Sequence, residues 1–469
     1  MSTFSGLNTA SSALAAARRG MDLVGQNIAN QTTPGYTRQR LETSAVAAVA
    51  VSGRFSAGAQ PGQGVSVDGI ARLGDAVLDA RVRDTLAASG YWSTRASAAA
   101  SAEAALAEPT DNGIAHQLSE FWASWQDLAN RPDSTAAAAA VITHAQALSG
   151  RIADGYRTVA DQWASVRSKA DMTVSQINVA AAQIADLNGA IREALGAGGA
   201  PSELIDRRNL LAQNVARLSG ATSAVEADGT LTVRIDGNAL VSGSDARALM
   251  LSGPPSIEST APLVLAWGPG GTLVVDSAGG ELGGQLSVLA PASEGGVLAG
   301  LAGDFNALAT ALATAVNTQH RAGVTSAGTP GGDFFSLTAG GPAALGLGVI
   351  PTGTADLAIG LAGGGPLDGS NADALSDVGG RPGGPNGLWS DVVARLAVST
   401  ASEAGRASRA DAGATAAVVA QQSVAGVDGD EETVNLLTLQ TSYQAAARVL
   451  TAVDEALDVL INRTGLVGR

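Results

Sequence analysis

The stretch that decides the fold is NLLTLQTSYQAAARVLTAVDEALDVL, residues 435–460, in which apolar residues recur every seven positions. One position of this heptad repeat holds Leu436, Tyr443, Leu450 and Leu457, and the position three residues later holds Leu439, Ala446, Val453 and Leu460. An apolar repeat sustained over four heptads is typical of a helix that packs lengthwise against another helix. We therefore expect the C-terminus to be a coiled-coil helix.

A similar repeat lies at the N-terminus. Residues 2–30 are predicted to be helical, with Leu7, Leu14, Met21 and Ile28 at seven-residue steps and Ala10, Ala17 and Val24 between them. For either end alone, an ordinary core helix packed within its own domain is the simpler interpretation. Because both ends carry the repeat, we expect these helices to pair with each other or with other subunits.

The predicted assembly interface follows from the two repeats. It comprises Leu7, Leu14, Met21, Ile28, Leu436, Leu439, Tyr443, Leu450, Val453, Leu457 and Leu460. In an isolated monomer the C-terminal members would form a long exposed apolar stripe, which is unfavourable in water. We therefore predict that the two ends are largely disordered until neighbouring subunits bury them.

The interior is predicted to contain long helices. The clearest covers residues 134–195, where Tyr156, Trp163, Ala170, Ile177, Ile184 and Ile191 recur at seven-residue intervals. At 1.5 Å per residue this helix would be on the order of 90 Å long. Shorter helices are predicted at 114–130, 298–312 and 388–427.

The periodicity changes to that of β-strands in two regions. In DGTLTVRIDGNALVSG, residues 228–243, apolar and polar residues alternate before Asp236-Gly237, a typical hairpin turn. Residues 263–275 predict a second hairpin. The segment 322–386 is rich in Gly, Pro, Ala and Asp with short apolar runs, which suggests an irregular β insertion.

The predicted fold class is mainly α with β, in an elongated multidomain chain. Because residues 1–220 and 388–469 are both expected to be helical, we expect the chain to fold back on itself with both termini at one end. We divide it into a terminal coiled-coil domain (1–60 plus 428–469), a helical bundle domain (61–225 plus 290–322 plus 386–427) and a β-rich outer domain (226–289 and 323–385).

Composition excludes several kinds of partner. With 28 basic and 43 acidic residues the net charge is −15, which disfavours binding to nucleic acid or to an anionic membrane. Cysteine is absent, so disulfides and thiol chemistry are excluded. No run approaches the roughly 18 apolar residues of a membrane span, and the N-terminus lacks the pattern of a cleaved signal peptide. If the protein leaves the cytoplasm, we expect another exporter.

Nothing in the sequence predicts an active site, a cofactor or a metal. The sole lysine, Lys169, lies in a helical pattern and cannot form a nucleotide-binding P-loop. His116, His144 and His320 lack metal-ligand spacing and are interpreted as helix-surface or helix-end residues. The acidic run 428–432 lacks the rest of a calcium-binding loop, and its place before the C-terminal repeat favours a helix start.

The N-terminal helix is followed by a distinctive stretch, GQNIANQTTPGYTRQR, residues 25–40. Pro34 and Gly35 suit the two central positions of a type II turn, so the helix is predicted to end near Asn30. Asn27 and Asn30 are expected to bond local backbone there. A helix end followed by an exposed loop explains the turn but not the polar and aromatic residues after it.

This stretch resembles the N-terminal signature of the bacterial flagellar axial proteins, the family of rod, hook and hook-associated proteins. The matching residues are Asn27, Ile28, Ala29, Asn30, Thr33, Pro34, Gly35, Tyr36 and Arg38. The signature marks the whole group. Residues 201–220, 315–335 and 426–465 resemble, more narrowly, the hook-associated protein 1 family, which forms the hook–filament junction.

The resemblance implies a structural protein rather than an enzyme. The terminal helices would pair into an inner tube domain, a helical domain would surround it, and a β domain would face outward. The chain would be exported without a cleaved signal peptide through the flagellar type III apparatus, and it would assemble outside the cell on the finished hook. Tyr36 and Arg38 are assigned to subunit contacts near the hinge between inner and outer domains, with an ordinary exposed loop as the alternative.

The resemblance also implies a set of partners. These are further copies of the chain, the hook protein, the second junction protein (hook-associated protein 3) and an export chaperone at the C-terminal helix. Neither nucleic acid nor a membrane is among them, and no cofactor is implied.

Three alternatives stay open. A hook or rod subunit would share the signature but not the interior matches. A secreted enzyme or adhesin would need convergent titratable residues in the β insertion. A cytoplasmic coiled-coil tether would not need the Asn-Ile-Ala-Asn turn.

Overall fold

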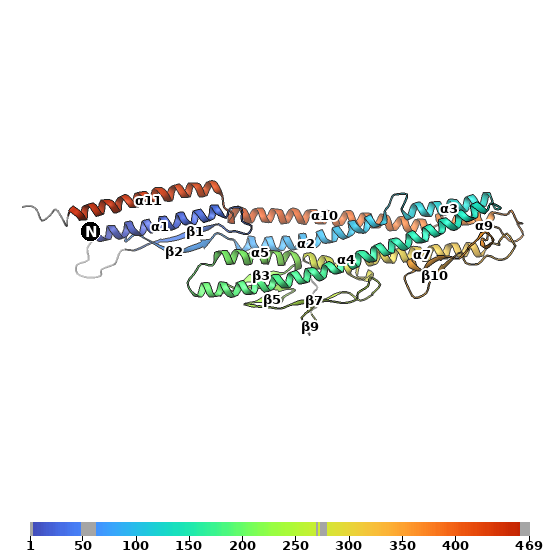
Figure 1. The fold of residues 1–469 in the computed structure, drawn as a ribbon, viewed down its shortest axis with the longest axis horizontal. Coiled ribbons are helices and arrows are strands. Elements are labelled where there is room, and N and C mark those ends of the chain that lie inside the picture. Colours follow the sequence, from blue (N-terminus) through green and yellow to red (C-terminus); the bar gives the residue numbers. More distant parts are fainter. Residues whose placement is uncertain (1–2, 48–61, 269–270, 273–278, 460–469) are drawn as a thin grey trace, which may run out of the picture.

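The computed structural model describes residues 3–47, 62–268, 271–272 and 279–459. They form an elongated molecule in which helices from the two ends of the chain run side by side (Figure 1). In that arrangement α1 (Thr3–Ala29) lies along α11 (Gly429–Asp458), and α2 (Ala76–Leu106) lies along α10 (Pro385–Ala425). The first and last described residues lie at the same end, which confirms that the chain folds back on itself.

The α1–α11 pair is antiparallel and its heptads are in phase. Asn27 hydrogen-bonds Glu432 at 3.2 Å, and one heptad further along a Cβ on Gly20 would lie only 2.9 Å from a methyl carbon of Leu439. Two heptads beyond that, Gly6 faces Val453. The absence of a side chain on Gly20 therefore lets the two helices approach closely.

A two-stranded antiparallel sheet, β1 (Gln39–Ala45) and β2 (Val65–Arg72), lies against α1 (Figure 1). The expectation that residues 1–220 are helical is wrong at this point. The alternation is weak in both strands, and the register shifts between Glu42 and Thr43, so the sequence carries no clear period of two. The strands form because each supplies the other with backbone partners on the surface of α1.

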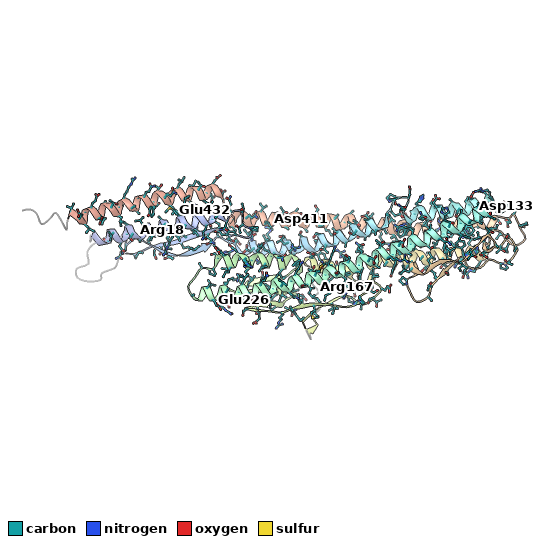
Figure 2. All side chains as sticks on the ribbon, in the orientation of Figure 1. Arg18, Asp133, Arg167, Glu226, Asp411 and Glu432 are labelled. Atoms are coloured by element: carbon teal, nitrogen blue, oxygen red, sulfur yellow. The ribbon has the colours of Figure 1, made fainter. Side chains whose placement is uncertain are left out.

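The long interior helix is present, with bounds close to those predicted. It is α4 (Thr135–Gly196), 62 residues long, and the side chain of Ser134 caps it by accepting from the N–H of Ala137 at 3.2 Å. Every member of the predicted Tyr156-to-Ile191 repeat is buried. Figure 2 places Asp133, just before α4, at the end of the molecule opposite the α1–α11 pair.

Four shorter helices pack on this rod. They are α3 (Ile114–Asn130), α5 (Ser202–Ser219), α6 (Gly280–Leu289) and α7 (Val297–Arg321). Among the described residues, α7 is the one helix long and apolar enough to cross a membrane by composition. It is a core helix here, because Leu301, Phe305 and Leu312 are buried against the rest of the protein.

Two small antiparallel sheets occupy the side of α4. One has the order β3 (Thr222–Val225), β4 (Leu231–Ile235), β5 (Asn238–Ser242) and β6 (Asp245–Ala246). The other has the order β7 (Leu249–Ser252), β8 (Val264–Trp267) and β9 (Gly271–Thr272). Both predicted hairpins are therefore confirmed over the described residues, with Asp236 and Gly237 at positive φ in the first turn.

Asparagines on α4 hold the first residues of two of these strands. Asn188 donates to the carbonyl of Leu231 at 2.9 Å and accepts from its N–H at 2.8 Å. Asn178 makes the same two bonds with Leu249, at 2.9 and 2.8 Å. Each side-chain amide thus binds both backbone groups of one strand residue, as a residue of a neighbouring strand would. We call such a side chain an asparagine anchor.

Two further asparagine anchors lie on other helices. Asn317 of α7 pairs with both backbone groups of Phe335, each at 2.8 Å. Asn27 of α1 pairs in the same way with Gln39, at 2.9 and 3.1 Å. Four strands, β1, β4, β7 and β10 (Phe335–Leu337), therefore begin at a residue held by a helix side chain.

The segment 323–385 contains less strand than expected. Its strands are β10 (Phe335–Leu337) and β11 (Leu347–Val349), and its helices are α8 (Ala343–Gly346) and α9 (Ser370–Ser376). Short 3₁₀ turns occur at Ala292–Glu294, Thr354–Asp356 and Val378–Gly380. Backbone groups of the segment pair with one another in turns, and Asn317 binds backbone groups of Phe334 and Phe335, so the segment packs without an extended sheet.

Candidate functional site

The base of the α1–α11 pair is where residues from five elements meet. The eight residues that join the pair to the body are Asn27, Tyr36, Thr37, Arg38, Arg72, Asp206, Glu431 and Glu432, and we call this set the clamp. Figure 2 labels Glu432 at this point. The clamp thus positions the α1–α11 pair on the rest of the protein.

The turn after α1 directs the chain into the clamp. Gly35 has φ +77°, and the N–H of Tyr36 donates to the carbonyl of Thr33 at 3.2 Å. These features confirm the predicted type II turn, in which only a residue tolerant of positive φ fits the third position. The turn sends residues 36–38 back beneath α1.

Asn27 is buried and uses its whole hydrogen-bonding capacity. Besides its anchor bonds to Gln39, its amide donates to Glu432 at 3.2 Å, and its oxygen accepts from the hydroxyl of Tyr36 at 2.9 Å. The expectation that Asn27 bonds local backbone is wrong, because its partners lie 9 to 405 residues away in the chain. Asn30 does bond locally, to the carbonyl of Gln26 at 3.0 Å.

Arg38 spans the break between α10 and α11. Its backbone N–H donates to the carbonyl of Ala425, the last residue of α10, at 2.8 Å. Its guanidinium binds Glu431 at 2.7 Å and Glu432 at 2.7 and 2.8 Å, in the first turn of α11. One residue therefore holds both sides of the break.

The start of α11 is capped as its sequence predicted. The carboxylate of Asp428 accepts from the N–H groups of Asp430 and Glu431, at 2.9 and 3.3 Å, which confirms the predicted helix start. Within the described ranges, no group of three or more His, Asp or Glu residues is arranged to hold a metal ion.

Asp206 of α5 ties the clamp to the helical body. It accepts from the N–H of Thr37 at 3.1 Å and forms an ion pair with Arg72, whose guanidinium also donates to the hydroxyl of Thr37 at 2.8 Å. Sequence reasoning missed Asp206 and Arg72. The available signal was the charged run Asp206-Arg207-Arg208 between apolar residues. The structure buries Asp206 and Arg208 of this run.

Burial shapes the ionisation of these groups. Burial, followed by the nearby carboxylates of Asp206, Glu203 and Glu432, raises the pKa of Tyr36 from 10.0 to about 12, so its hydroxyl remains a donor to Asn27. Burial and then the charge of Arg72 lower the pKa of Arg208 to about 10. Arg208 offsets this by donating to the carbonyl of Gly229 at 2.6 Å.

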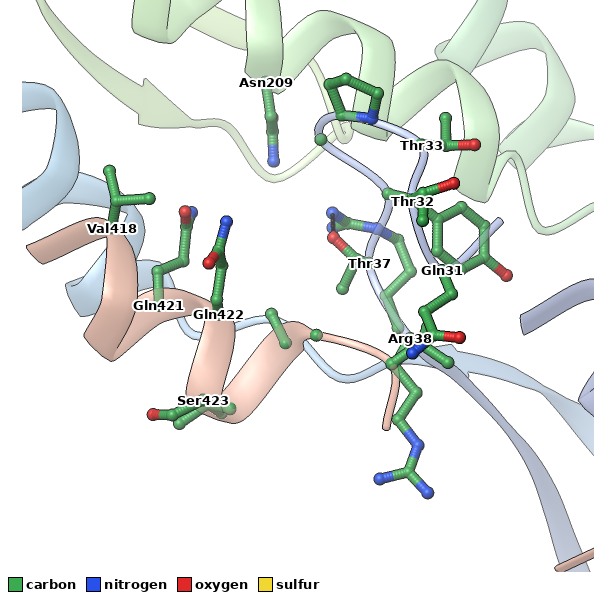
Figure 3. Close-up of a pocket in the computed structure, with 18 of the residues that line it drawn as sticks. Gln31, Thr32, Thr33, Thr37, Arg38, Asn209, Val418, Gln421, Gln422 and Ser423 are labelled. Atoms are coloured by element: carbon green, nitrogen blue, oxygen red, sulfur yellow. Dashed lines mark hydrogen bonds between the residues drawn. The ribbon is translucent and has the colours of Figure 1, made fainter. Parts of the chain in front are cut away.

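A cavity of about 870 Å³ opens beside the clamp (Figure 3). Its walls are α5, the end of α10 and the turn after α1, and its lining carries the amides Gln31, Asn209, Gln213, Gln421 and Gln422. The close-up shows the turn on one side of this space and α10 on the other. The cavity is thus a polar crevice between the terminal pair and the body.

The predicted interface residues fall into three groups. Half-buried members are Leu7, Leu14, Met21, Leu436, Leu439, Leu450, Val453 and Leu457. Ile28 and Tyr443 are 38% and 39% exposed, and Leu460 lies outside the described residues. The buried apolar side chains of α1 are instead Ala10, Ala17, Leu23 and Val24.

Apolar residues also remain outside the α1–α11 contact. Val434, Leu437 and Val449 are exposed on α11, as is Val459 directly after it, and sequence reasoning did not assign them. With 3.6 residues per turn these four positions lie on one side of the helix. The sequence therefore contained this second apolar stripe, but the regular heptad repeat was the stronger pattern.

The signature residues are only partly brought together. Asn27, Tyr36 and Arg38 lie in the clamp and bond within the chain. Ile28, Ala29, Thr33, Pro34 and Gly35 are exposed on or near the turn, and Asn30 is half-buried. The assignment of Tyr36 and Arg38 to contacts between subunits stays a prediction.

Three family models match the chain. The flagellar hook-associated protein FlgK helical domain matches residues 99–335. The flagellar basal body rod FlgEFG protein C-terminal model matches residues 421–463, and the flagella basal body rod protein model matches residues 7–37. The clamp draws residues from all three matched segments.

Relatives match along much or all of the chain. It is 30% identical over 514 residues to flagellar hook-associated protein 1 of Bacillus subtilis, and the alignment covers all of both chains. It is 31% identical over 349 residues to flagellar hook-associated protein 1 of Escherichia coli, covering 72% of this chain and 61% of that relative.

A solved structure shares the fold. The flagellar hook junction protein FlgK from Burkholderia pseudomallei superposes with a TM-score of 0.64 at 17% sequence identity. The match covers 73% of this chain and all of that one. The mainly helical architecture with small antiparallel sheets is therefore the one expected for this group.

Replacing Arg38 should destabilise the clamp. Arg38→Ala removes the cation facing Glu432, whose side chain is 2% exposed, and a buried charge without its partner costs about 2 kcal/mol or more. We expect Arg38→Ala to unfold at lower urea concentration, measured by circular dichroism. Arg40→Ala, at an exposed position of β1, is the matched control and should unfold like the wild type. Equal midpoints for all three proteins would contradict a stabilising clamp.

The pKa of Tyr36 predicts a pH dependence at alkaline pH. Because folding favours the neutral phenol, its stabilising contribution is present below pH 10 and is lost as the pH rises toward about 12. Phenolate absorbance of the wild type minus that of Tyr36→Phe should titrate near pH 12. Tyr443→Phe, at the exposed tyrosine of α11, is the control. A difference curve for Tyr36 centred near pH 10 would show that its hydroxyl is not held in the clamp.

Proposed function

Because the chain belongs to the flagellar hook-associated protein 1 family, we propose that it is a structural component of the bacterial flagellum that forms the hook–filament junction. The observation that carries this proposal is the full-length match to the Bacillus subtilis relative. The helical-domain match favours this role over that of a hook or rod subunit, because the rod-type models match only the two ends of the chain.

The architecture suits an adaptor. We assign residues 1–60 plus 428–469 to an inner tube domain, 61–225 plus 290–322 plus 386–427 to a helical bundle, and 226–289 with 323–385 to the outer face. In support, α1 and α11 pair at one end of an elongated molecule and the small sheets lie on the side of α4 (Figure 1). The β1–β2 hairpin extends the inner unit beyond residue 60, as far as Arg72.

The terminal pair is the proposed contact with neighbouring copies, the hook protein and the second junction protein. Its two helices retain exposed or half-exposed apolar residues on sides that do not face each other, including Ile28, Val434, Leu437 and Val449. Burying such residues is favourable by about 25 cal/mol per Å² of apolar surface. Assembly would therefore stabilise helices that are marginal in an isolated chain.

The apolar face of α11 also bears on how the chain would be exported and shielded from water before assembly. The chain would pass through the type III apparatus without a cleaved signal peptide and would function outside the cell. An export chaperone bound along α11 would cover Leu436, Leu450 and Leu457 while the α1–α11 pair is apart. After export, pairing of α1 with α11 would then cover the apolar face of α11 in place of the chaperone.

Deletion of the gene in its own bacterium tests the function. Electron microscopy should show finished hooks without filaments, and flagellin should accumulate in the medium. Restoring the gene should restore filaments. Missing or abnormal hooks would instead assign the protein to the rod or hook, and normal filaments would refute the proposal.

The heptad contact predicts the behaviour of a single variant. Leu450→Asp puts a charge on the half-buried face of α11 that meets α1, so it should block incorporation while leaving the helical body folded. The measurement is filament recovery in the deletion strain, with circular dichroism of the purified variant. Val398→Asp, at a 71% exposed position of α10, introduces the same charge away from the pair and should restore filaments. Normal incorporation of Leu450→Asp would refute the heptad interface.

A further inference from the structure

At the end of the molecule opposite the terminal pair, a buried histidine holds two loop segments. His320, in the last turn of α7, is 1% exposed. Its Nδ1 lies 2.8 Å from the carbonyl oxygen of Gly332, and its Nε2 lies 3.0 Å from the backbone nitrogen of Ala358. The helix end predicted for His320 is confirmed, but the residue is a buried hydrogen-bonding centre.

These contacts determine the protonation state of the ring. The N–H of Ala358 can only donate, so Nε2 must accept and carries no proton. The carbonyl of Gly332 can only accept, so Nδ1 must carry one. The folded protein therefore requires the neutral Nδ1–H form of His320.

The two segments held by the ring also hold each other. Val324 and Gly360 exchange backbone hydrogen bonds at 2.8 and 3.2 Å, and Asn371 of α9 donates to the carbonyl of Ala358 at 2.6 Å. Beneath them lie the rings of Trp125 and Phe334, 6.2 and 5.6 Å from the imidazole centre. Opening this region would expose aromatic surface.

Few charges are placed to stabilise an imidazolium here. Asp333 is near, but Arg321 pairs with it at 2.9 Å. Arg381 bonds the neighbouring Gln319 at 3.1 Å and would repel a positive ring. From α3 the indole of Trp125 faces His320, and from the segment around Ala358 a backbone N–H faces it. From α9 the uncharged amide of Asn371 bonds the adjacent Gln319 and the carbonyl of Ala358.

We propose that His320 is an acid-sensitive latch, in which protonation at Nε2 breaks the bond to Ala358 and lets the segment 323–361 detach from the end of α7. Protonation places two N–H donors face to face, and the ring must then leave its buried position to be solvated. Burial lowers the pKa of His320 below 6.5, which is the direction expected for a group that must stay neutral.

The sign of the pH dependence follows directly. A lowered folded-state pKa gives stabilisation that is present above pH 6.5 and is lost as the pH falls through the folded-state pKa. Between these two values the local opening equilibrium should rise roughly tenfold per pH unit. Below the folded-state pKa the rise should level off.

Hydrogen exchange of the intact protein, measured by mass spectrometry and corrected for the intrinsic effect of pH, tests the latch. In the wild type, protection of peptides that contain Ala358 should fall below pH 6.5, while peptides in the middle of α4 keep theirs. In His320→Gln, which cannot titrate, protection should not vary with pH. His144→Gln, at a half-buried position of α4 away from the latch, is the matched control and should follow the wild type.

Constant protection of the wild type through this range would overturn the latch, as would an equal fall in His320→Gln. If His320→Gln does not fold, nitrogen chemical shifts of the wild-type ring decide the matter. The Nδ1–H form with a pKa below 6.5 supports the latch, whereas a ring that titrates at or above 6.5 refutes it.

Discussion

The buried carboxylate of Glu432 is the constraint on which the arrangement of the two chain ends depends. A carboxylate removed from water needs charged or hydrogen-bonding partners, and those of Glu432 are Arg38 and Asn27, 394 and 405 residues away in the chain. Meeting them sets the lengthwise register of α1 against α11. In that register Gly20 faces Leu439 and the heptads are in phase. The apolar repeats thus supply attraction, and the polar contacts at their base supply alignment.

The same contacts orient the pair relative to the body. Arg38 also binds the last carbonyl of α10, and Asp206 of α5 receives both Thr37 and Arg72. An ordinary loop after α1 would satisfy its own backbone and leave the direction of the pair free. The polar and aromatic residues that follow the Pro-Gly turn therefore have a structural role. They join the α1–α11 pair to the α2–α10 pair.

Local patterns in the sequence predicted much of this fold. The repeats of α1, α4 and α11 depend on the period of an α-helix, and the turn at Gly35 and the hairpin at Asp236 depend on backbone preferences of single residues. The β1–β2 sheet, by contrast, has weak alternation and forms on the surface of α1. Likewise the roles of Asp206 and Glu432 depend on partners far away in sequence, which no local pattern specifies. Of the candidate site, the sequence therefore indicated the residues around the turn but not what they bind.

The asparagine anchors have a consequence for how such a protein changes over time. Asn188, Asn178, Asn317 and Asn27 each recognise the backbone N–H and C=O of one strand residue, and every non-proline amino acid presents those two groups alike. The strand residue so held is under little pressure from the anchor to keep its side chain. Helices that retain four asparagines can therefore carry strands of very different composition. Sequence divergence in a family built this way should concentrate in the strands and loops, while the helices keep their asparagine anchors.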